Sequence, residues 1–224
     1  MRLRYLAWMT AGGAAALMLC LWSTAGSLQR SFAGGQDDAG PTLISRDERH
    51  YVTPNQLATS GEAAGRQVMR GAMLASDGRQ VGWDDLSAGR PMVVVFIKDG
   101  CPCSIEFEPY FHRLARAFAK HVQFVGVIDG AADVASAYVA ANDVPYPVLA
   151  DSDRSLIRDF AAKNAAYVAL VSADGVVDTM WPGCSAEMMQ DLARQITARA
   201  GIHEQPVDFA GMPGPLTTGC PFRE

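Results

Sequence analysis

Two continuous apolar runs, separated by one helix-length segment, constrain the fold of this chain more than any other feature. Residues 91–98 read PMVVVFIK and residues 122–128 read VQFVGVI, which is the pattern of strands buried on both faces of a sheet. The segment between them predicts an amphipathic helix from about residue 101 to residue 120, with an apolar stripe made of Phe107, Phe111, Leu114, Ala115 and Phe118. Strand, helix and strand in this order predict a parallel pair with a right-handed crossover.

The rest of the segment from residue 66 to residue 200 adds helices and antiparallel strands. Asp-Gly turns predict two hairpins, over residues 67–83 and 167–181. Helical spacing with suitable start residues predicts three further helices, over residues 131–142, 151–163 and 185–200. We therefore expect a single domain over residues 66–200. Its fold class is α/β, a sandwich with a central mixed sheet and helices on both faces.

The flanking segments have a different composition. Residues 29–65 are rich in Gly, Ser, Ala, Asp and Thr and are predicted to be a linker, and the Gly- and Pro-containing residues 201–224 are predicted to be an irregular tail. In residues 1–28, two arginines precede an apolar stretch and a group of small residues, which predicts a signal anchor or a cleaved signal peptide. The membrane is thus an expected partner, with the domain anchored on the periplasmic or extracellular side, or secreted if the segment is cut.

Charge excludes one class of function. The net charge is −5, and Lys and Arg form no cluster, so the electrostatic footprint of a nucleic-acid-binding protein is missing. A hydrophobic content of 49% with 19% charged residues is that of a globular protein. Glu106 and Glu108 fit a solvated helix face near the positive end of the helix dipole, and His112 fits a helix surface.

Cys101 and Cys103 lie at the point where the first apolar run passes into the predicted helix. Unpaired backbone N–H groups and the positive end of the helix dipole lower the pKa of a cysteine at a helix N-terminus, and the thiolate is the nucleophilic form. Pro102 suits the first helical position, where its missing N–H is not needed. Cys101 is therefore the predicted nucleophile.

The partner of Cys101 stays open between Cys103 and Cys184. A bond between residues i and i+2 requires Cys101 to stay outside the regular helix. Two strand reversals bring Cys184 to the edge of the sheet that carries Cys101, but two strand spacings are roughly 10 Å, so a local segment would have to move. Cys220, in the tail, could reach almost any of these positions, and its role stays open. In an oxidising compartment, permanent disulfides are the alternative, and these four exported cysteines allow three pairings.

A metal site is a further alternative. It would use Cys101, Cys103 and a histidine, as soft copper-handling sites do. The four histidines show no ligand-like spacing with the two cysteines, so the sequence predicts no metal and no cofactor.

The order of elements, the cysteine motif after the first buried strand and the Asp-Gly hairpin together resemble the thioredoxin-like superfamily. Within it, the segment VPYPVLADSDRSLIRDF (residues 144–160) is similar to the insertion of redoxins of the alkyl hydroperoxide reductase/thiol-specific antioxidant group (AhpC/TSA) and of their membrane-tethered thiol-disulfide relatives. The resemblance covers about residues 66–200. It implies a thioredoxin-like fold and thiol–disulfide or peroxide chemistry at a cysteine on a helix N-terminus.

Two positions depart from the pattern of the tethered relatives. The tethered relatives carry C-P-P-C, with a further proline eight residues after the first cysteine. Here Pro109 lies eight residues after Cys101, which aligns Cys101 with the first cysteine of the motif. Ser104 then takes the place of the second cysteine, and Cys103 lies one position before that place. The cis-proline of the superfamily corresponds to Ala166.

The resemblance implies an exported thiol-dependent oxidoreductase that exchanges thiols and disulfides through Cys101, with Cys103 or Cys184 as the resolving thiol. Its substrates would be protein thiols or disulfides, or a peroxide. A thiol peroxidase is the first alternative, although Lys98 stands where peroxidases of this group carry a threonine or serine. A non-catalytic binding module of the same fold is the second. The oligomeric state stays unknown.

Overall fold

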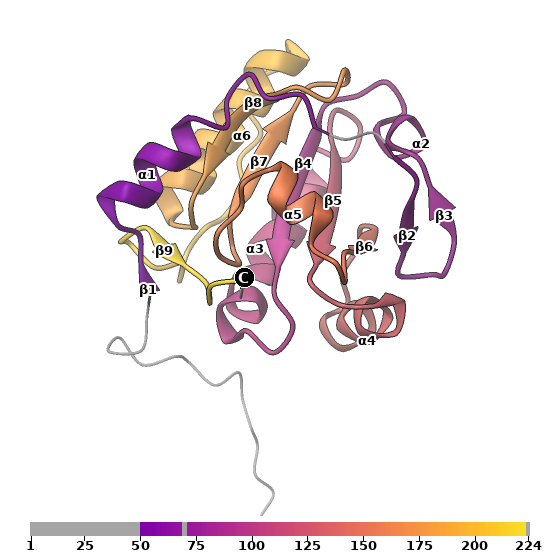
Figure 1. Ribbon diagram of the computed structural model, residues 1–224. Helices are drawn as coiled ribbons and strands as arrows, with labels where there is room; N and C mark the ends of the chain where they lie inside the picture. The colour runs from indigo at the N-terminus through magenta and orange to yellow at the C-terminus, as the bar shows by residue number, and fades with distance from the viewer. Residues whose placement is uncertain (1–49, 69–70, 223–224) are drawn as a thin grey trace, which may run out of the picture. The chain divides into compact units, whose positions relative to one another are not determined.

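The computed structural model describes residues 50–68 and 71–222 (Figure 1). The predicted signal segment, residues 1–28, and the first part of the predicted linker, residues 29–49, lie outside the described residues. In the part of the chain that is described, no helix is long and apolar enough to cross a membrane.

A mixed seven-stranded sheet with the strand order β3-β2-β6-β5-β4-β7-β8 forms the centre of the domain (Figure 1). The β4–β5 and β5–β6 pairs are parallel and the other pairs are antiparallel, which confirms the mixed sheet. The strands are β2 Met73–Ala75, β3 Gln80–Val81, β4 Met92–Ile97, β5 Gln123–Ile128, β6 Val148–Ala150, β7 Val168–Val171 and β8 Val177–Trp181.

Six helices are found in the described ranges: α1 Pro54–Gly61, α2 Trp83–Ser87, α3 Pro102–Ala117, α4 Ala132–Asn142, α5 Ser155–Asp159 and α6 Ala186–Ala200. Side chains alternate along the central strand β4, so Val93, Val95 and Ile97 belong to a core with α3, α4 and α6. Met92, Val94 and Phe96 belong to a second core with α2 and α5. Helices thus cover both faces of the sheet, as predicted.

The β4–α3–β5 unit forms as the apolar pattern predicts. β4 pairs in parallel with β5, from Met92 opposite Gln123 to Ile97 opposite Ile128. Of the predicted stripe of α3, Ala115 packs against the core from a partly buried position, and the other four members are at most 1% exposed: Phe107, Phe111, Leu114 and Phe118. The predicted helices after β5 form as well, although the one expected over residues 151–163 is reduced to α5.

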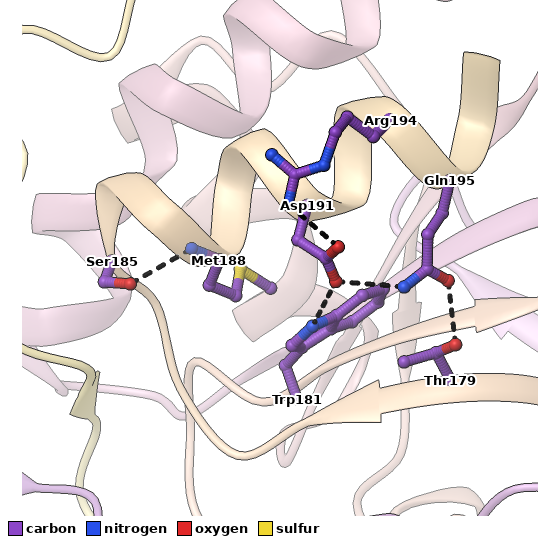
Figure 2. Close-up of polar contacts among 7 residues, drawn as sticks. All are labelled: Thr179, Trp181, Ser185, Met188, Asp191, Arg194 and Gln195. Carbon is purple, nitrogen blue, oxygen red and sulfur yellow. Dashed lines mark hydrogen bonds and ion pairs between the residues drawn. The ribbon is translucent and has the colours of Figure 1, made fainter. Parts of the chain in front are cut away.

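Polar contacts attach α6 to β8 and thereby fix the loop that carries Cys184 (Figure 2). Ser185 caps α6 by accepting a hydrogen bond from Met188 N–H at 3.1 Å. One turn further, Asp191 accepts a bond from the Trp181 indole of β8 at 3.2 Å. The loop between β8 and α6 is therefore held at both ends.

The linker prediction is wrong for residues 54–61, which form α1. A capping box starts this helix, because Thr53 Oγ1 accepts from Gln56 N–H and the Gln56 side chain accepts from Thr53 N–H. Small residues allow α1 to pack closely, with Ser60 buried, and α1 contacts β8. Small residues also gave this segment its linker-like composition. The tail is irregular except for β9 (Thr217–Thr218), which pairs with β1 (His50–Tyr51).

Candidate active site

A tight turn after β4 places Cys101 at the N-terminus of α3. Cys101 N–H donates to the Lys98 carbonyl at 3.1 Å, and Gly100 takes a φ of +67°, a conformation that glycine adopts without strain. Cys101 is the N-cap, with φ −87° and ψ 116°, and Pro102 is the first helical residue. Cys101 is thus outside the regular helix, as a contact with Cys103 requires.

The Cys101 sulfur lies in a buried site surrounded by hydrogen-bond donors. Cys101 is 1% exposed, and its Sγ accepts a hydrogen bond from the backbone N–H of Cys220 at 3.2 Å. The thiol of Cys103 donates a second bond, and the backbone N–H of Ser104 contributes less. These bonds, with that from Cys103 the strongest, lower the pKa of Cys101 to about 4. These bonds therefore favour the thiolate form of the predicted nucleophile.

Cys103 and Cys101 lie together, as the sequence allowed. Cys103 is 3% exposed, and all four cysteines in the described residues are free thiols. The hydrogen bond to Cys101, followed by burial, raises the pKa of Cys103 well above its usual range. In this arrangement, Cys103 is the proton donor of the pair and Cys101 carries the charge.

Lys98 does not contribute the main stabilisation of the Cys101 thiolate. Its Nζ lies 3.3 Å from Asp129 Oδ2, and the backbone N–H of Asp99 donates to Asp129 Oδ1 at 2.8 Å. Asp129 thus pairs with the cation beside the turn. Ser104, in the place of the second cysteine of the motif, is buried, and its hydroxyl accepts from Lys98 N–H at 3.2 Å.

Cys184 lies in the same buried core as Cys101 but bonds a backbone carbonyl. Its thiol donates to the Ala166 oxygen at 3.4 Å. Burial, with a smaller effect of Glu108, raises the pKa of Cys184 well above its usual range. Ala166, where the resemblance to the superfamily places a cis-proline, has a φ of +61°, which is strained for a residue with a Cβ. Cys184 is thus a protonated, buried thiol.

Residues 217–222, which we call the C-terminal strap, lie against residues 163–166. Five hydrogen bonds join the two segments: Ala165 N–H to Cys220 O (3.0 Å), Gly219 N–H to Ala165 O (2.8 Å), Phe222 N–H to Lys163 O (2.9 Å), Asn164 Nδ2–H to Gly219 O (2.9 Å) and the Thr218 hydroxyl to Ala165 O (3.4 Å). At the start of the strap, Thr217 exchanges two backbone bonds with Cys184, at 2.8 and 2.9 Å. The strap therefore brings Cys220, whose role the sequence left open, to Cys101.

A buried carboxyl group on α3 is the feature that the sequence analysis missed. Glu108 is 2% exposed, so its predicted place on a solvated face is wrong. It accepts a hydrogen bond from the Tyr138 hydroxyl at 2.8 Å and another from the Tyr146 hydroxyl, and His112 Nε2 lies 3.3 Å from it. Burial, followed by the charge of Glu108, raises the pKa of both tyrosines well above the usual range. His112 is also largely buried, not on the helix surface.

The spacing of Glu108 carried the signal for its burial. Glu108 is four residues after the buried Ser104 and three before the buried Phe111, so it shares their helix face. The two tyrosines could not be assigned to it without the fold, because they come from α4 and from the loop before β6.

Comparison with known proteins identifies the family of the chain. The model of the family described as "AhpC/TSA family" matches residues 64–180, more than half of the chain's 224 residues. The chain belongs to the AhpC/TSA family.

Solved structures show the same fold as this AhpC/TSA chain. The bacterioferritin comigratory protein of Xanthomonas campestris is 20% identical with a TM-score of 0.52, covering 64% of this chain and 95% of its own. Peroxidoxin BcpB of Mycobacterium tuberculosis is 18% identical with a TM-score of 0.51, covering 62% and 96%. DsbF of M. tuberculosis is 26% identical with a TM-score of 0.50, covering 58% and 94%. These structural matches confirm the thioredoxin-like fold. No curated protein matches the chain.

Other features of this AhpC/TSA protein lie apart from the cysteines. The cleft between the β2–β3 hairpin and residues 144–147 is lined by no cysteine. Within the described ranges, no group of three or more His, Cys, Asp or Glu side chains is arranged to hold a metal ion.

Proposed function

We propose that this protein is a thiol-dependent oxidoreductase that exchanges thiols and disulfides through Cys101. The observation that carries the proposal is the Cys101 sulfur at the N-terminus of α3, bonded by the Cys220 N–H at 3.2 Å and by the Cys103 thiol. A pKa of about 4 keeps Cys101 ionised at neutral pH. Membership of the AhpC/TSA family supports thiol-based redox chemistry.

The exchange proceeds in two balanced steps. The Cys101 thiolate attacks one sulfur of a substrate disulfide; the substrate S–S bond breaks, a mixed disulfide forms, and the other substrate sulfur leaves as a thiolate. A second thiol of the protein then loses its proton and attacks the Cys101 sulfur, which releases the first substrate sulfur. The substrate gains two electrons, the protein ends with an internal disulfide, and an external dithiol returns it to the reduced form. In reverse, the oxidised protein would oxidise a substrate dithiol.

Burial of Cys101 favours a thiol peroxidase as the second candidate. With 1% of Cys101 exposed, a small hydroperoxide reaches the sulfur more readily than a folded protein does. The thiolate would attack the peroxide O–O bond, giving a sulfenic acid and an alcohol or water, and a second thiol would condense with the sulfenic acid to a disulfide and water. The X. campestris relative is described as having alkyl peroxide reduction activity, which supports testing this chain for peroxidase activity.

Turnover assays separate these functions. The reduced full-length chain is supplied with an external dithiol and either a protein disulfide or hydrogen peroxide, and the loss of each substrate is followed. We expect reduction of the disulfide and its loss in Cys101→Ser. Faster turnover of the peroxide would favour the peroxidase. Activity that survives Cys101→Ser would contradict the nucleophile, and inactivity toward both substrates would favour a binding module.

We also propose that the domain works outside the cytoplasm and is anchored by residues 1–28 unless that segment is cleaved. The pattern of arginines, apolar residues and small residues in that segment supports this proposal. Fractionation of cells that express the full chain, with protease added to intact spheroplasts, tests it. Protection of the domain from protease in intact spheroplasts would contradict export.

A further inference from the structure

Building on the proposed function, we propose that Cys220 is the thiol that resolves Cys101 and that the C-terminal strap delivers it. The sequence analysis left Cys103 and Cys184 for this role and left the role of Cys220 open. The structure puts the backbone of Cys220 on the Cys101 sulfur, with N–H to Sγ at 3.2 Å, across 119 positions of sequence. The nearby Cys101 thiolate is also among the causes that raise the pKa of the Cys220 thiol.

The strap is held against the site by backbone geometry. It bonds residues 163–166 on one side and the backbone of Cys184 on the other. A Cβ at Gly219 would lie 2.7 Å from Ala165 Cβ and 2.9 Å from the Ala165 carbonyl oxygen, and a Cβ at Gly183 would lie 2.4 Å from the Thr217 oxygen. Both glycines are therefore needed for the strap to approach this closely. The register of these contacts fixes which residue meets Cys101, and that residue is Cys220.

Access to Cys101 requires the strap to move. Cys101 is 1% exposed, and the strap residue that contacts its sulfur is itself only half-buried. Lifting the strap would uncover the thiolate for a disulfide substrate. Return of the strap would then bring Cys220 to the mixed disulfide, so one movement both admits the substrate and supplies the second thiol.

The competing thiols are less suited to the second step. Cys103 is fixed in the first turn of α3, and a bond to Cys101 would close a tight ring between residues i and i+2. Cys184 is completely buried and bonds Ala166. Cys220 is the half-buried thiol, and burial, followed by its bond to the Cys101 thiolate, raises its pKa to about 11. Once Cys101 is in a mixed disulfide, its negative charge is gone, and the proton of Cys220 is lost more easily.

The proposed step balances. Cys220 gives up its proton and attacks the Cys101 sulfur of the mixed disulfide; the Cys101–Cys220 bond forms, and the bond from Cys101 to the substrate sulfur breaks. The substrate leaves as a thiolate and takes up a proton. An external dithiol then reduces the Cys101–Cys220 disulfide by the same exchange.

Trapping with oxidised glutathione as the disulfide probe tests the inference. The reduced full-length chain is mixed with the probe, quenched with acid at intervals and alkylated, and its peptides are mapped without reduction. In the wild type we expect a Cys101–Cys220 disulfide. In Cys220→Ser we expect glutathione to stay on Cys101 about tenfold longer or more, because the resolving thiol is absent. The Cys220→Ser backbone N–H can still bond the Cys101 sulfur, and circular dichroism checks that the variant folds.

Cys103→Ser is the matched control, because its hydroxyl can still donate to Cys101. This variant should still form the Cys101–Cys220 disulfide. A wild-type bond from Cys101 to Cys103 or Cys184, or release of glutathione from Cys220→Ser at the wild-type rate, would overturn the inference and leave the proposed function standing. If Cys101 takes up no glutathione in any variant, the proposed function fails and the inference with it.

Discussion

The charge on Cys101 is stabilised by hydrogen bonds from neutral groups. The nearby cation of Lys98 is paired with Asp129 at 3.3 Å, while the Cys220 N–H donates to the sulfur and the Cys103 thiol is the largest cause of the lowered pKa of Cys101. Bonds to the charged form lower a pKa because they favour the thiolate over the thiol. The reactivity of Cys101 thus depends on residues that themselves carry no charge.

Removing the donor at Cys103 should raise the pKa of Cys101. A hydrogen bond to a charged group contributes about 1.5–3 kcal/mol, so Cys103→Ala should raise that pKa by about 1–2 units from its value of about 4. Cys103→Ser keeps a hydroxyl donor and should raise the pKa of Cys101 by less. Thiolate absorbance in the ultraviolet, followed against pH and corrected with Cys101→Ser, gives the values. Equal pKa values in Cys103→Ala and the wild type would show that Cys103 is not the main donor.

Glu108 is expected to stabilise the fold through the two tyrosines that bond it. Glu108→Ala leaves the buried hydroxyls of Tyr138 and Tyr146 without this acceptor, and the free energy of unfolding should fall by about 3 kcal/mol. The exposed Glu204→Ala should change it by less than about 0.5 kcal/mol. Urea denaturation of both variants measures this. Equal, small changes would mean that the tyrosines find other acceptors.

The sequence predicted the individual residues unevenly. Cys101 was found because a local pattern, an apolar run followed by a helix, fixes its place at a helix N-terminus. Cys220 has no such local pattern, since its contact depends on bonds formed with residues 163–166 far away in the chain. Glu108 was assigned to the solvent because a carboxylate is usually exposed, and only the fold brings the hydroxyls that compensate its burial.

At the scale of elements, the strap is a short segment held by close backbone contacts, so small changes should loosen it. Gly219→Ala places a Cβ 2.9 Å from the carbonyl oxygen of Ala165, which cannot turn away as a flexible side chain would. Gly214, in the same tail, has open space around it, so Gly214→Ala is the matched control. The two variants carry the same chemical change and differ in whether it meets the segment of residues 163–166.

Gly219→Ala should make Cys101 react faster with an alkylating agent. A clash that costs on the order of 1–2 kcal/mol would expose Cys101 about tenfold more often. The measurement is the rate of Cys101 modification by iodoacetamide in the reduced full chain, read by peptide mass. Gly214→Ala should react at the wild-type rate. Equal rates in all three proteins would mean that the strap does not control access.

Elements with strong periodicity were predictable, and elements that depend on distant partners were not. The runs of β4 and β5 and the stripe of α3 determine those elements directly. α1 was missed because small residues resemble a linker until β8 is available to pack against. The strap was expected to be irregular; its β9 forms only by pairing with β1, a segment more than 160 positions earlier.

For the molecule as a whole, ionisation of the cysteine pair couples folding to pH. The pKa of Cys101 is lowered to about 4 in the folded state, compared with about 8.5 in an unfolded chain. Between these values the unfolded state binds one more proton, so the contribution of Cys101 to stability increases with pH and is lost as pH falls toward 4. The pKa of Cys103 is raised instead, so above about pH 8.5 the folded state binds the extra proton and stability decreases.

The reduced protein should therefore gain stability relative to Cys101→Ser as the pH increases from 5 toward 8.5, by at most about 1.4 kcal/mol per pH unit. Above that pH the gain should shrink, because Cys103 in the wild type is held protonated by its bond to Cys101. Urea denaturation of both proteins at several pH values, with a reductant present, gives the difference. Comparing the two proteins cancels most of the effect of every other titrating group. A difference that does not change with pH would mean that Cys101 is not a thiolate in the folded protein, and the nucleophile would then have to be activated only when substrate binds.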